Sequence, residues 1–420
     1  MATSGAGSRL VTLDVIRGIA VMGIFSVNVV AMAMITSAYF YPPAYGFHSL
    51  GDRIMWLANF IFIDGKMRSL FSMLFGASML LVIERAKASG LAPARVHYAR
   101  MVVLLLFGLL HFTVLWWGDI LTLYAAVGML AFLFWKLPAR WLLGVAMLGF
   151  VIFSTGSIHF TSQGFAQYEA ATAPNPSPEA TKRFEEQRRF LHPNAKELAK
   201  DRSEHATPVA HFKSVVPERI IEPFDFGPLW IETLALMLLG MAGYKSGFLT
   251  GQWSDANYRR AAAAGLGIGA LAYAALGIWV WSSGFRPPES RFAYGGISVP
   301  FRPVMALGYA AAIILLFRRP SAIRDRFAAV GRAAFTNYLG ATIIGTLVFF
   351  GFGGDLYGKV SRAEAWLLVP LVWLVMLAWS KPWLDRFQYG PFEWLWRSLA
   401  RWELQPLRRR RPATALAPEA

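Results

Sequence analysis

Three polar side chains within one apolar run give this sequence its first candidate chemistry. Arg17 and Asn28 lie in the apolar run 13–36, and Asp14 precedes Arg17 by about one helical turn. Because Asn28 follows Arg17 by about three turns, a helix presents all three polar groups on nearly the same face. A guanidinium buried alone costs about a few kcal/mol, so we expect Arg17 either to pair with Asp14 or to bind an anion through its planar donors.

A histidine and two carboxylates form a second group of candidates. His111 lies in a strongly apolar run, and an imidazole oriented by an acid can act as a general base near pH 7. Asp119 and Glu232 are both candidates for that acid. A histidine that only hydrogen-bonds a neighbouring helix is an open alternative, and Asp119 can equally be an N-cap of the helix after it. His48, in an aromatic-rich loop, is a further candidate base.

Other polar groups sit at the ends or interruptions of apolar runs and could hold a donor substrate. The full set of candidate binding residues is Asp14, Arg17, Lys66, Arg68, Asn337 and Tyr338. Within the apolar runs no pair of histidines or carboxylates has the i, i+3 or i, i+4 spacing of helical metal ligands. We therefore expect no metal.

The composition identifies the elements that must position these groups as membrane helices. Hydrophobic residues make up 56% of the 420 residues and charged residues only 16%, whereas soluble domains carry about 25% charged residues. The absence of cysteine excludes disulfides, cysteine nucleophiles and thiolate metal sites. The net charge of +16 resides mainly in short loops and the tail, which favours membrane topology and lipid contacts over nucleic acid.

Hydropathy predicts an all-α, polytopic bundle of about ten transmembrane helices. The expected spans are residues 13–36, 70–83, 101–117, 121–135, 141–154, 228–244, 261–281, 304–317, 333–352 and 365–379. The apolar run 54–63 is too short to cross a bilayer of about 30 Å, so an interfacial or re-entrant helix is expected there. Neither an inverted repeat nor a pair of broken helices of the transporter kind is visible in the sequence.

The basic loops predict the orientation and the domains. Lys and Arg cluster in alternate short connections, which places these loops and both termini in the cytoplasm of a bacterial inner-membrane protein. We expect an N-terminal bundle at 1–157, an extracytoplasmic polar insertion at 158–225, a C-terminal bundle at 226–402 and a basic tail at 403–420. Within the insertion, 179–201 has the composition of a solvated helix, and a homo-oligomer is left open.

Four stretches resemble one family of bacterial membrane proteins. SRLVTLDVIRGIAVMGIFSVNVV, DGKMRSLFSMLFGASMLLV, LLFGLLHFTVLWWGDILTLYAAVG and YGPFEWLWRSLARWELQPLRR are together similar to the DUF418 or YeiB family, over nearly the whole chain. The start of the first run, Leu13-Asp14-x-x-Arg17-Gly18, more distantly resembles acyltransferase-3 and heparan-α-glucosaminide N-acetyltransferase-type membrane acyltransferases. In the acyltransferase-3 pattern a histidine stands at the position of Asn28.

This distant resemblance implies acyl transfer from a cytoplasmic acetyl-CoA or other acyl-CoA to a sugar, lipid or glycan acceptor outside. Arg17 would hold the phosphates of the donor, Asn28 would bind the thioester or the acceptor, and His48 or His111 would be the base. The alternative is a transporter of a small metabolite or ion that uses the buried Arg, His and Glu side chains. A non-catalytic role of the outer insertion is also open.

Overall fold

The chain folds into a bundle of helices. The computed structural model describes residues 11–221 and 226–409, which contain helices and one isolated bridge, between Phe387 and Arg408, but no named strand. The longer helices are α1 (Val11–Ala33), α3 (Leu50–Phe62), α4 (Lys66–Ala88), α5 (Pro93–Leu110), α6 (Leu121–Ala131), α7 (Ala139–Thr172), α12 (Leu229–Lys245), α13 (Asp255–Ser282), α15 (Phe301–Leu316), α17 (Ala334–Phe349) and α19 (Leu368–Arg386). The all-α fold is confirmed.

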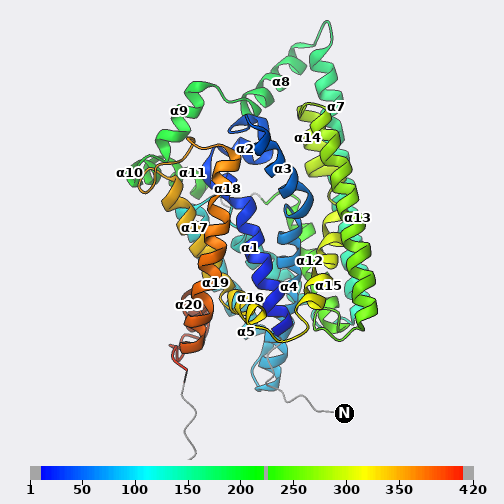
Figure 1. Cartoon of the computed structure of the whole chain (residues 1–420), viewed down its shortest axis with the longest axis vertical. Coiled ribbons are helices and arrows are strands. Elements are labelled where there is room, and N and C mark those ends of the chain that lie inside the picture. Colours follow the sequence, from blue (N-terminus) through cyan, green and yellow to red (C-terminus); the bar gives the residue numbers. More distant parts are fainter. Residues whose placement is uncertain (1–10, 222–225, 410–420) are drawn as a thin grey trace, which may run out of the picture.

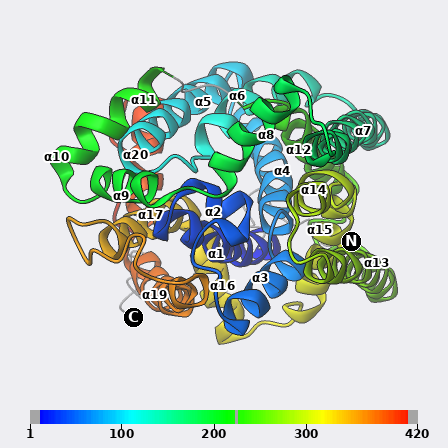
Figure 2. The ribbon, with the colours of Figure 1, turned by 90° about the horizontal axis from the view of Figure 1, so that it is seen from above.

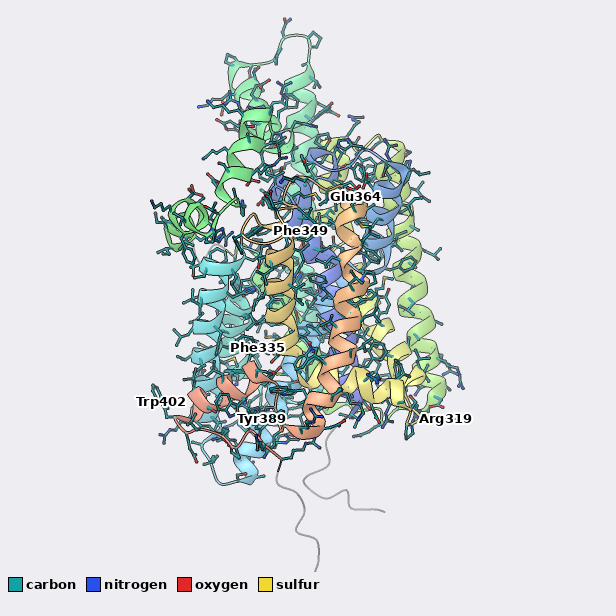
Figure 3. The ribbon with its side chains drawn as sticks, turned by 60° about the vertical axis from the view of Figure 1, so that its left-hand side comes forward. Arg319, Phe335, Phe349, Glu364, Tyr389 and Trp402 are labelled. Carbon is teal, nitrogen blue, oxygen red and sulfur yellow. The ribbon has the colours of Figure 1, made fainter. Side chains whose placement is uncertain are left out.

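Shorter helices cover the two ends of the bundle. They are α2 (Thr36–Phe40), η1 (Pro42–Ala44), η2 (His111–Leu115), η3 (Phe132–Phe134), α8 (Pro178–Leu191), α9 (Ala195–Glu204), α10 (Pro208–Ala210), η4 (His211–Val215), α11 (Val216–Ile221), α14 (Pro287–Phe292), η5 (Ala293–Ile297), α16 (Ala322–Arg332), α18 (Arg362–Trp366) and α20 (Pro391–Arg401). We call the end that carries α8 and α9 the insertion end, and the opposite end, where α16 and α20 lie, the basic end (Figure 1). Arg319 and Trp402 lie at the basic end and Glu364 toward the insertion end (Figure 3).

Six helical segments of the described chain are long and apolar enough to cross a membrane, and one bent pair raises the number to seven. The six are Val11–Ala33, Leu50–Ala88, Pro93–Leu115, Ala139–Thr172, Asp255–Ser282 and Arg362–Arg386, and the bent pair is Pro287–Ile297 with Phe301–Leu316. Two further apolar helices, Leu121–Phe134 and Ala334–Phe349, are shorter. These segments are those of a polytopic membrane protein, and the count of ten spans stays a prediction.

Helix α1 is the central element of the bundle. It packs against α4, α15, α16, α17 and α19, and the view from the insertion end shows it surrounded by other helices (Figure 2). In its apolar window 78% of the residues are buried, against 22% in α5, α7 and α13, which lie at the rim. The polar side chains of α1 therefore face protein, as the sequence predicts.

Three helices differ from their predicted limits. Helix α7 continues to Thr172, so the start of the expected polar insertion is a helical extension of a span. The solvated helix expected at 179–201 is two helices, α8 and α9, and the second begins with an Asn194 capping box. Helix α5 begins at Pro93 and therefore also contains His97, whereas the sequence places only His111 within a span. The basic tail and both chain ends fall wholly or partly outside the described residues.

Two apolar segments are interrupted, and the interruptions touch through the side chain of Arg302. Helix α3 leads through residues 63–65 into α4, so the expected interfacial or re-entrant helix is instead the first part of one 39-residue apolar segment. Helices α14 and α15 are bent by 58° around η5 and Ser298 to Pro300. Gly65 has φ +73°, and a Cβ there would lie 2.9 Å from Cδ of Arg302. Only glycine fits both this backbone and this approach.

The C-terminal motif Gly390-Pro391-Phe392-Glu393 anchors α20 to the start of α17. The buried Glu393 carboxylate accepts hydrogen bonds from the backbone N–H groups of Phe335 (2.7 Å) and Thr336 (3.2 Å), and from the Thr336 hydroxyl at 2.5 Å. A carboxylate satisfies the free N–H groups at a helix start and complements its dipole. We therefore interpret this motif as a structural cap.

Candidate functional site

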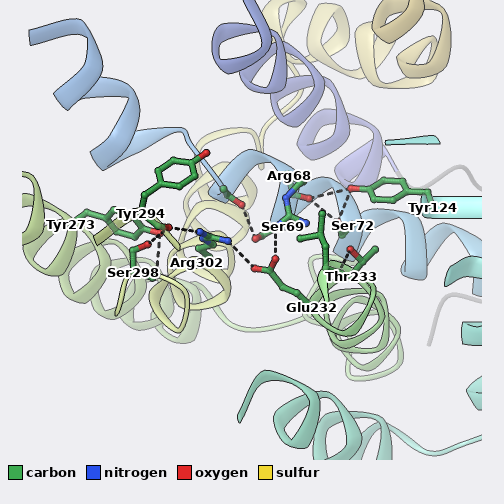
Figure 4. Close-up of polar contacts among 12 residues, drawn as sticks. Arg68, Ser69, Ser72, Tyr124, Glu232, Thr233, Tyr273, Tyr294, Ser298 and Arg302 are labelled. Atoms are coloured by element: carbon green, nitrogen blue, oxygen red, sulfur yellow. Dashed lines mark hydrogen bonds and ion pairs between the residues drawn. The ribbon is translucent and has the colours of Figure 1, made fainter. Parts of the chain in front are cut away.

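A buried carboxylate shared by two arginines lies where the two interrupted spans meet. Arg68 of α4 forms a salt bridge with Glu232 of α12, and Nη1 of Arg302, from α15, lies 3.5 Å from the same carboxylate (Figure 4). Glu232 is fully buried. We call Arg68, Glu232 and Arg302 the Arg–Glu–Arg cluster. The predicted candidates Arg68 and Glu232 are thus neighbours, but Glu232 orients no histidine.

Lys66 and two tyrosines extend this cluster. The Lys66 side chain is fully buried, donates a hydrogen bond to the Phe60 carbonyl and lies 3.0 Å from the ring centroid of Tyr273. Arg302 donates to the Tyr294 carbonyl at 2.7 Å, and the Tyr273 hydroxyl donates to the backbone carbonyl of Ser298 at 3.1 Å (Figure 4). No salt bridge to Lys66 is present in the described part of the chain. The ammonium is instead held by a carbonyl and an aromatic face.

A small cavity between α1 and α3, which we call the mid-bundle cavity, adjoins these residues on the side of the insertion end, where α2, η1, α14 and α18 also line it (Figure 1). Its volume is about 30 Å³. It is lined by Val27, Val30, Tyr39, Phe40, Pro42, Trp56, Asn59, Phe60, Asp64, Val280, Ser290, Ala293, Tyr294 and Arg362. This volume accommodates about two water molecules. The cavity is therefore nearly closed in this conformation, and a larger ligand requires the surrounding helices to move.

Three side chains lining the mid-bundle cavity have a buried polar atom without a hydrogen-bond partner in the described structure. These atoms are Oδ1 of Asn59, Oγ of Ser290 and Nε of Arg362. Burial of an unsatisfied polar group costs about 1–3 kcal/mol, and such groups are rare in folded proteins. Their convergence on one cavity indicates a place where a polar ligand or ordered water completes the hydrogen bonding.

The predicted pairing of Arg17 with Asp14 is confirmed. Their side chains form a salt bridge of 2.9 Å, and Arg17 also donates to the Ser78 hydroxyl at 2.6 Å and the Gly331 carbonyl at 3.3 Å. Asn28 is half-buried farther along α1, and its side chain makes no hydrogen bond within the described residues. Arg17 therefore ties α1 to α4 and α16 in this conformation.

The predicted partnership of His111 with Asp119 is also present. Nδ1 of His111 lies 2.8 Å from Asp119, and Nε2 lies 3.0 Å from the Thr342 hydroxyl. Asp119 also accepts a hydrogen bond of 2.7 Å from the backbone N–H of Thr122, in the first turn of α6, although the N-cap position itself is occupied by Ile120. Both imidazole nitrogens are occupied and the ring is buried, so this arrangement fits helix packing better than an accessible base.

The predicted site residues do not line the mid-bundle cavity, and those not yet described lie elsewhere. Asn337 bonds with Ser380 at 3.1 Å and with Trp379 at 2.9 Å, whereas Tyr338 lies against His111 with 5.3 Å between ring centroids. His48 is exposed just before the capping box of α3. No group of three or more His, Asp or Glu side chains among the described residues could hold a metal ion.

Several residues of this site are not among the predicted candidates. They are Arg302, Asn59, Tyr294, Arg362 and Asp64, the last of which directly follows the apolar run 54–63. A signal was present for Arg302, because Pro300 and Pro303 flank an arginine just before the predicted span 304–317. No local pattern marks the other residues.

Two buried histidines fasten the insertion helices to the bundle. His205 stacks on Tyr357 with 4.3 Å between ring centroids, and Nε2 of His211 donates to the Val114 carbonyl at 3.0 Å. Burial is the main cause that lowers the pKa of both His205 and His211 to about 4. The folded state therefore holds both rings neutral near pH 7.

We expect acid to loosen the contact of α9 to α11 with the bundle. Unfolded histidine titrates near pH 6.5, so between about pH 6.5 and 4 the released state binds more protons than the docked state. The stability of the docked state therefore decreases as the pH is lowered through this range. Hydrogen–deuterium exchange of 195–221, corrected for intrinsic rates, should be fastest near pH 4 and slowest above pH 7. His205→Phe, which can retain the stacking, should weaken this dependence. Equal protection at pH 4.5 and 7.5 would contradict the assignment.

Known proteins similar to this chain align with nearly its whole length. Residues 243–403 match the family described as "Protein of unknown function (DUF418)". Uncharacterized protein YxaH of Bacillus subtilis (strain 168) is 30% identical, covering 95% of this chain and 96% of its own. Uncharacterized protein YeiB of Escherichia coli (strain K12) is 29% identical, over 93% of this chain and 96% of its own. No solved structure matches the chain.

Proposed function

The chain belongs to the DUF418 family, and from that premise we propose that it is an inner-membrane protein that binds a small anionic solute in the mid-bundle cavity and carries it across the membrane. In this proposal the insertion end faces outward and the basic end faces the cytoplasm, as the positions of the Lys and Arg residues favour. The observation that carries the proposal is the set of unpartnered polar atoms at the cavity between two interrupted spans.

The interrupted helices support a site for a transported solute. Membrane transporters commonly bind substrate near the bilayer midplane, where discontinuous helices expose their ends. Helices α4 and α15 both begin at the touching interruptions, so the partial positive charges of two helix N-termini lie close together. No pair of broken helices is visible in the sequence, but the bent pair around η5 and the break before α4 provide two interruptions that support this proposal.

The charges around the site favour an anion. Only Arg362 and Asp64 among the charged residues line the cavity itself, and Nε of Arg362 has no hydrogen-bond partner among the described residues. Together with the adjoining Arg–Glu–Arg cluster, three guanidinium groups stand against the two carboxylates of Glu232 and Asp64. Charges inside a membrane are costly unless they are paired, so an anionic group on the solute would restore the balance.

The proposal predicts that Asn59→Leu separates stability from function. Leucine removes an unsatisfied buried oxygen, so the melting temperature should stay the same or rise. Loss of a hydrogen bond to a charged ligand should reduce uptake at least about tenfold. The measurement is uptake of labelled inorganic phosphate and small mono- and dicarboxylates into proteoliposomes. Arg53→Gln, on the exposed face of the same helix, should transport normally.

A second candidate is acyl transfer from a cytoplasmic acyl-CoA to an acceptor in the same cavity. It is favoured by a second cavity at the basic end, lined by two arginines. The acyl donor and the acceptor would then bind in two separate cavities. Arg17 and His111 would have to exchange their present partners to serve it. If no solute in the panel crosses above protein-free liposomes, and acetyl-CoA is hydrolysed in a manner that Arg17→Ala abolishes, acyl transfer replaces transport.

A further inference from the structure

A second polar cavity, the basic-end cavity, opens among the helix ends opposite the insertion. Its volume is about 210 Å³, several times that of the mid-bundle cavity. Its lining residues are Val11, Thr12, Val15, Thr250, Gly251, Ile313, Ile314, Phe317, Arg318 and Arg324. They come from α1, the loop after α12, the end of α15 and the start of α16. Four separate elements thus converge on a space that the transport proposal leaves without a role.

Two guanidinium groups line this cavity, and no carboxylate does. Nε of Arg324 is buried without a hydrogen-bond partner in the described structure, although the whole side chain is 19% exposed. Arg318 forms a salt bridge with Asp255 and lies 3.5 Å from the Trp253 carbonyl. Asp325 lies 4.0 Å from Nε of Arg324 without forming a hydrogen bond. These carboxylates compensate part of the charge from outside the cavity.

Two hydroxyl groups complete the polar lining. Thr12 and Thr250 stand on different elements, and the Thr250 hydroxyl donates to the Gly247 carbonyl at 3.1 Å, so only the Thr12 hydroxyl keeps its proton for a ligand. The apolar side chains of Val15 and Ile314 also line the cavity. The chemistry is therefore that of arginine forks and one hydroxyl donor beside apolar side chains.

We infer that the basic-end cavity binds the phosphate group of a ligand. Arginine presents several donors in a planar fork that matches phosphate oxygens bidentately, and a charged acceptor would satisfy Nε of Arg324. The volume admits a phosphate together with part of the molecule that carries it. A phospholipid headgroup and a soluble phosphate compound share this chemistry. The inference rests on different residues from the mid-bundle cavity and does not depend on the transport proposal.

The test measures stabilisation of the full chain by defined phosphate probes. In detergent, sodium pyrophosphate should raise the melting temperature saturably above chloride of equal ionic strength, as expected for a ligand that binds only the folded protein. In nanodiscs of phosphatidylcholine, added phosphatidylglycerol should have the same effect if the site takes a lipid headgroup. Stabilisation by pyrophosphate identifies a soluble phosphate ligand, and stabilisation by phosphatidylglycerol alone identifies a lipid.

Arginine variants decide whether either effect arises in this cavity. Arg324→Gln and Arg318→Gln should each reduce the stabilisation at least about tenfold in apparent affinity, since each removes a charge-assisted contact. Arg324→Lys keeps the positive charge but loses the planar fork of donors. Its apparent affinity for the probe should therefore lie between those of the wild type and of Arg324→Gln. Arg326→Gln is the matched control, because Arg326 lies on the same helix and donates to the Leu377 carbonyl instead. Absence of stabilisation by both probes, or equal stabilisation of all four variants, would overturn the inference.

Discussion

Replacing Glu232 by glutamine is expected to destabilise the protein more than any other conservative change at the Arg–Glu–Arg cluster. The carboxylate is fully buried between Arg68 and Arg302, so its removal leaves two largely buried guanidinium groups without their counter-charge. Breaking a buried ion pair by removing one partner costs about 3–5 kcal/mol. We therefore expect a large fall in melting temperature, measured by fluorescence-detected size-exclusion chromatography after heating, and loss of uptake in proteoliposomes.

A double-mutant cycle separates the ion pair from simple damage to the fold. Arg302→Gln should itself destabilise, but the double variant Glu232→Gln, Arg302→Gln should be less destabilised than the sum, because the second change removes an unpaired charge. Glu289→Gln is the control, since Glu289 is also buried but, among the described residues, forms its one salt bridge with the half-exposed Arg286 at 3.3 Å. Additive effects at Glu232 and Arg302 would show that the shared carboxylate is not what holds the cluster together.

The sequence was sufficient to identify individual polar groups of the cluster but not their partners. Arg68, Lys66 and Glu232 were predicted because ionisable residues within apolar spans rarely occur without a role. Their pairing across 164 residues, and the approach of Arg302, depend on which helices are neighbours, and hydropathy says nothing about that. Periodicity gives the face of a helix, whereas the neighbour opposite that face is decided by packing of the whole bundle.

Contacts within one or two turns were predicted more reliably. Asp14 pairs with Arg17 three residues away, and His111 pairs with Asp119 across the short connection that follows its helix. The predicted role of Asn28 depends instead on packing over a longer range. Its side chain is half-buried and makes no hydrogen bond within the described residues, so that role stays a prediction.

Two glycines set the distance between the helices that carry Arg68 and Glu232. Helices α4 and α12 cross where Gly76 and Gly240 each meet the other helix's backbone. A Cβ at Gly240 would lie 1.8 Å from the Met73 carbonyl oxygen, and a Cβ at Gly76 would lie 2.0 Å from that of Met237. Small residues allow such close approach of membrane helices. Arg68 and Glu232 each lie about two turns before the glycine on their own helix, so the crossing also positions the salt bridge.

Gly240→Ala is therefore expected to destabilise the protein, although alanine normally favours a helix by about 0.5–1 kcal/mol over glycine. The added methyl group meets backbone rather than a flexible side chain, so α4 and α12 must separate, at a cost of about 1–3 kcal/mol, and Gly240→Val should cost more. Gly144→Ala on α7, where a Cβ has nothing within 4 Å, should instead leave the melting temperature unchanged or raise it. The measurement is the melting temperature of each variant in the same detergent, which should fall for Gly240→Ala and not for Gly144→Ala. Equal responses at Gly240 and Gly144 would mean that the crossing does not fix the helix distance, and the Arg68–Glu232 pair would then need another support.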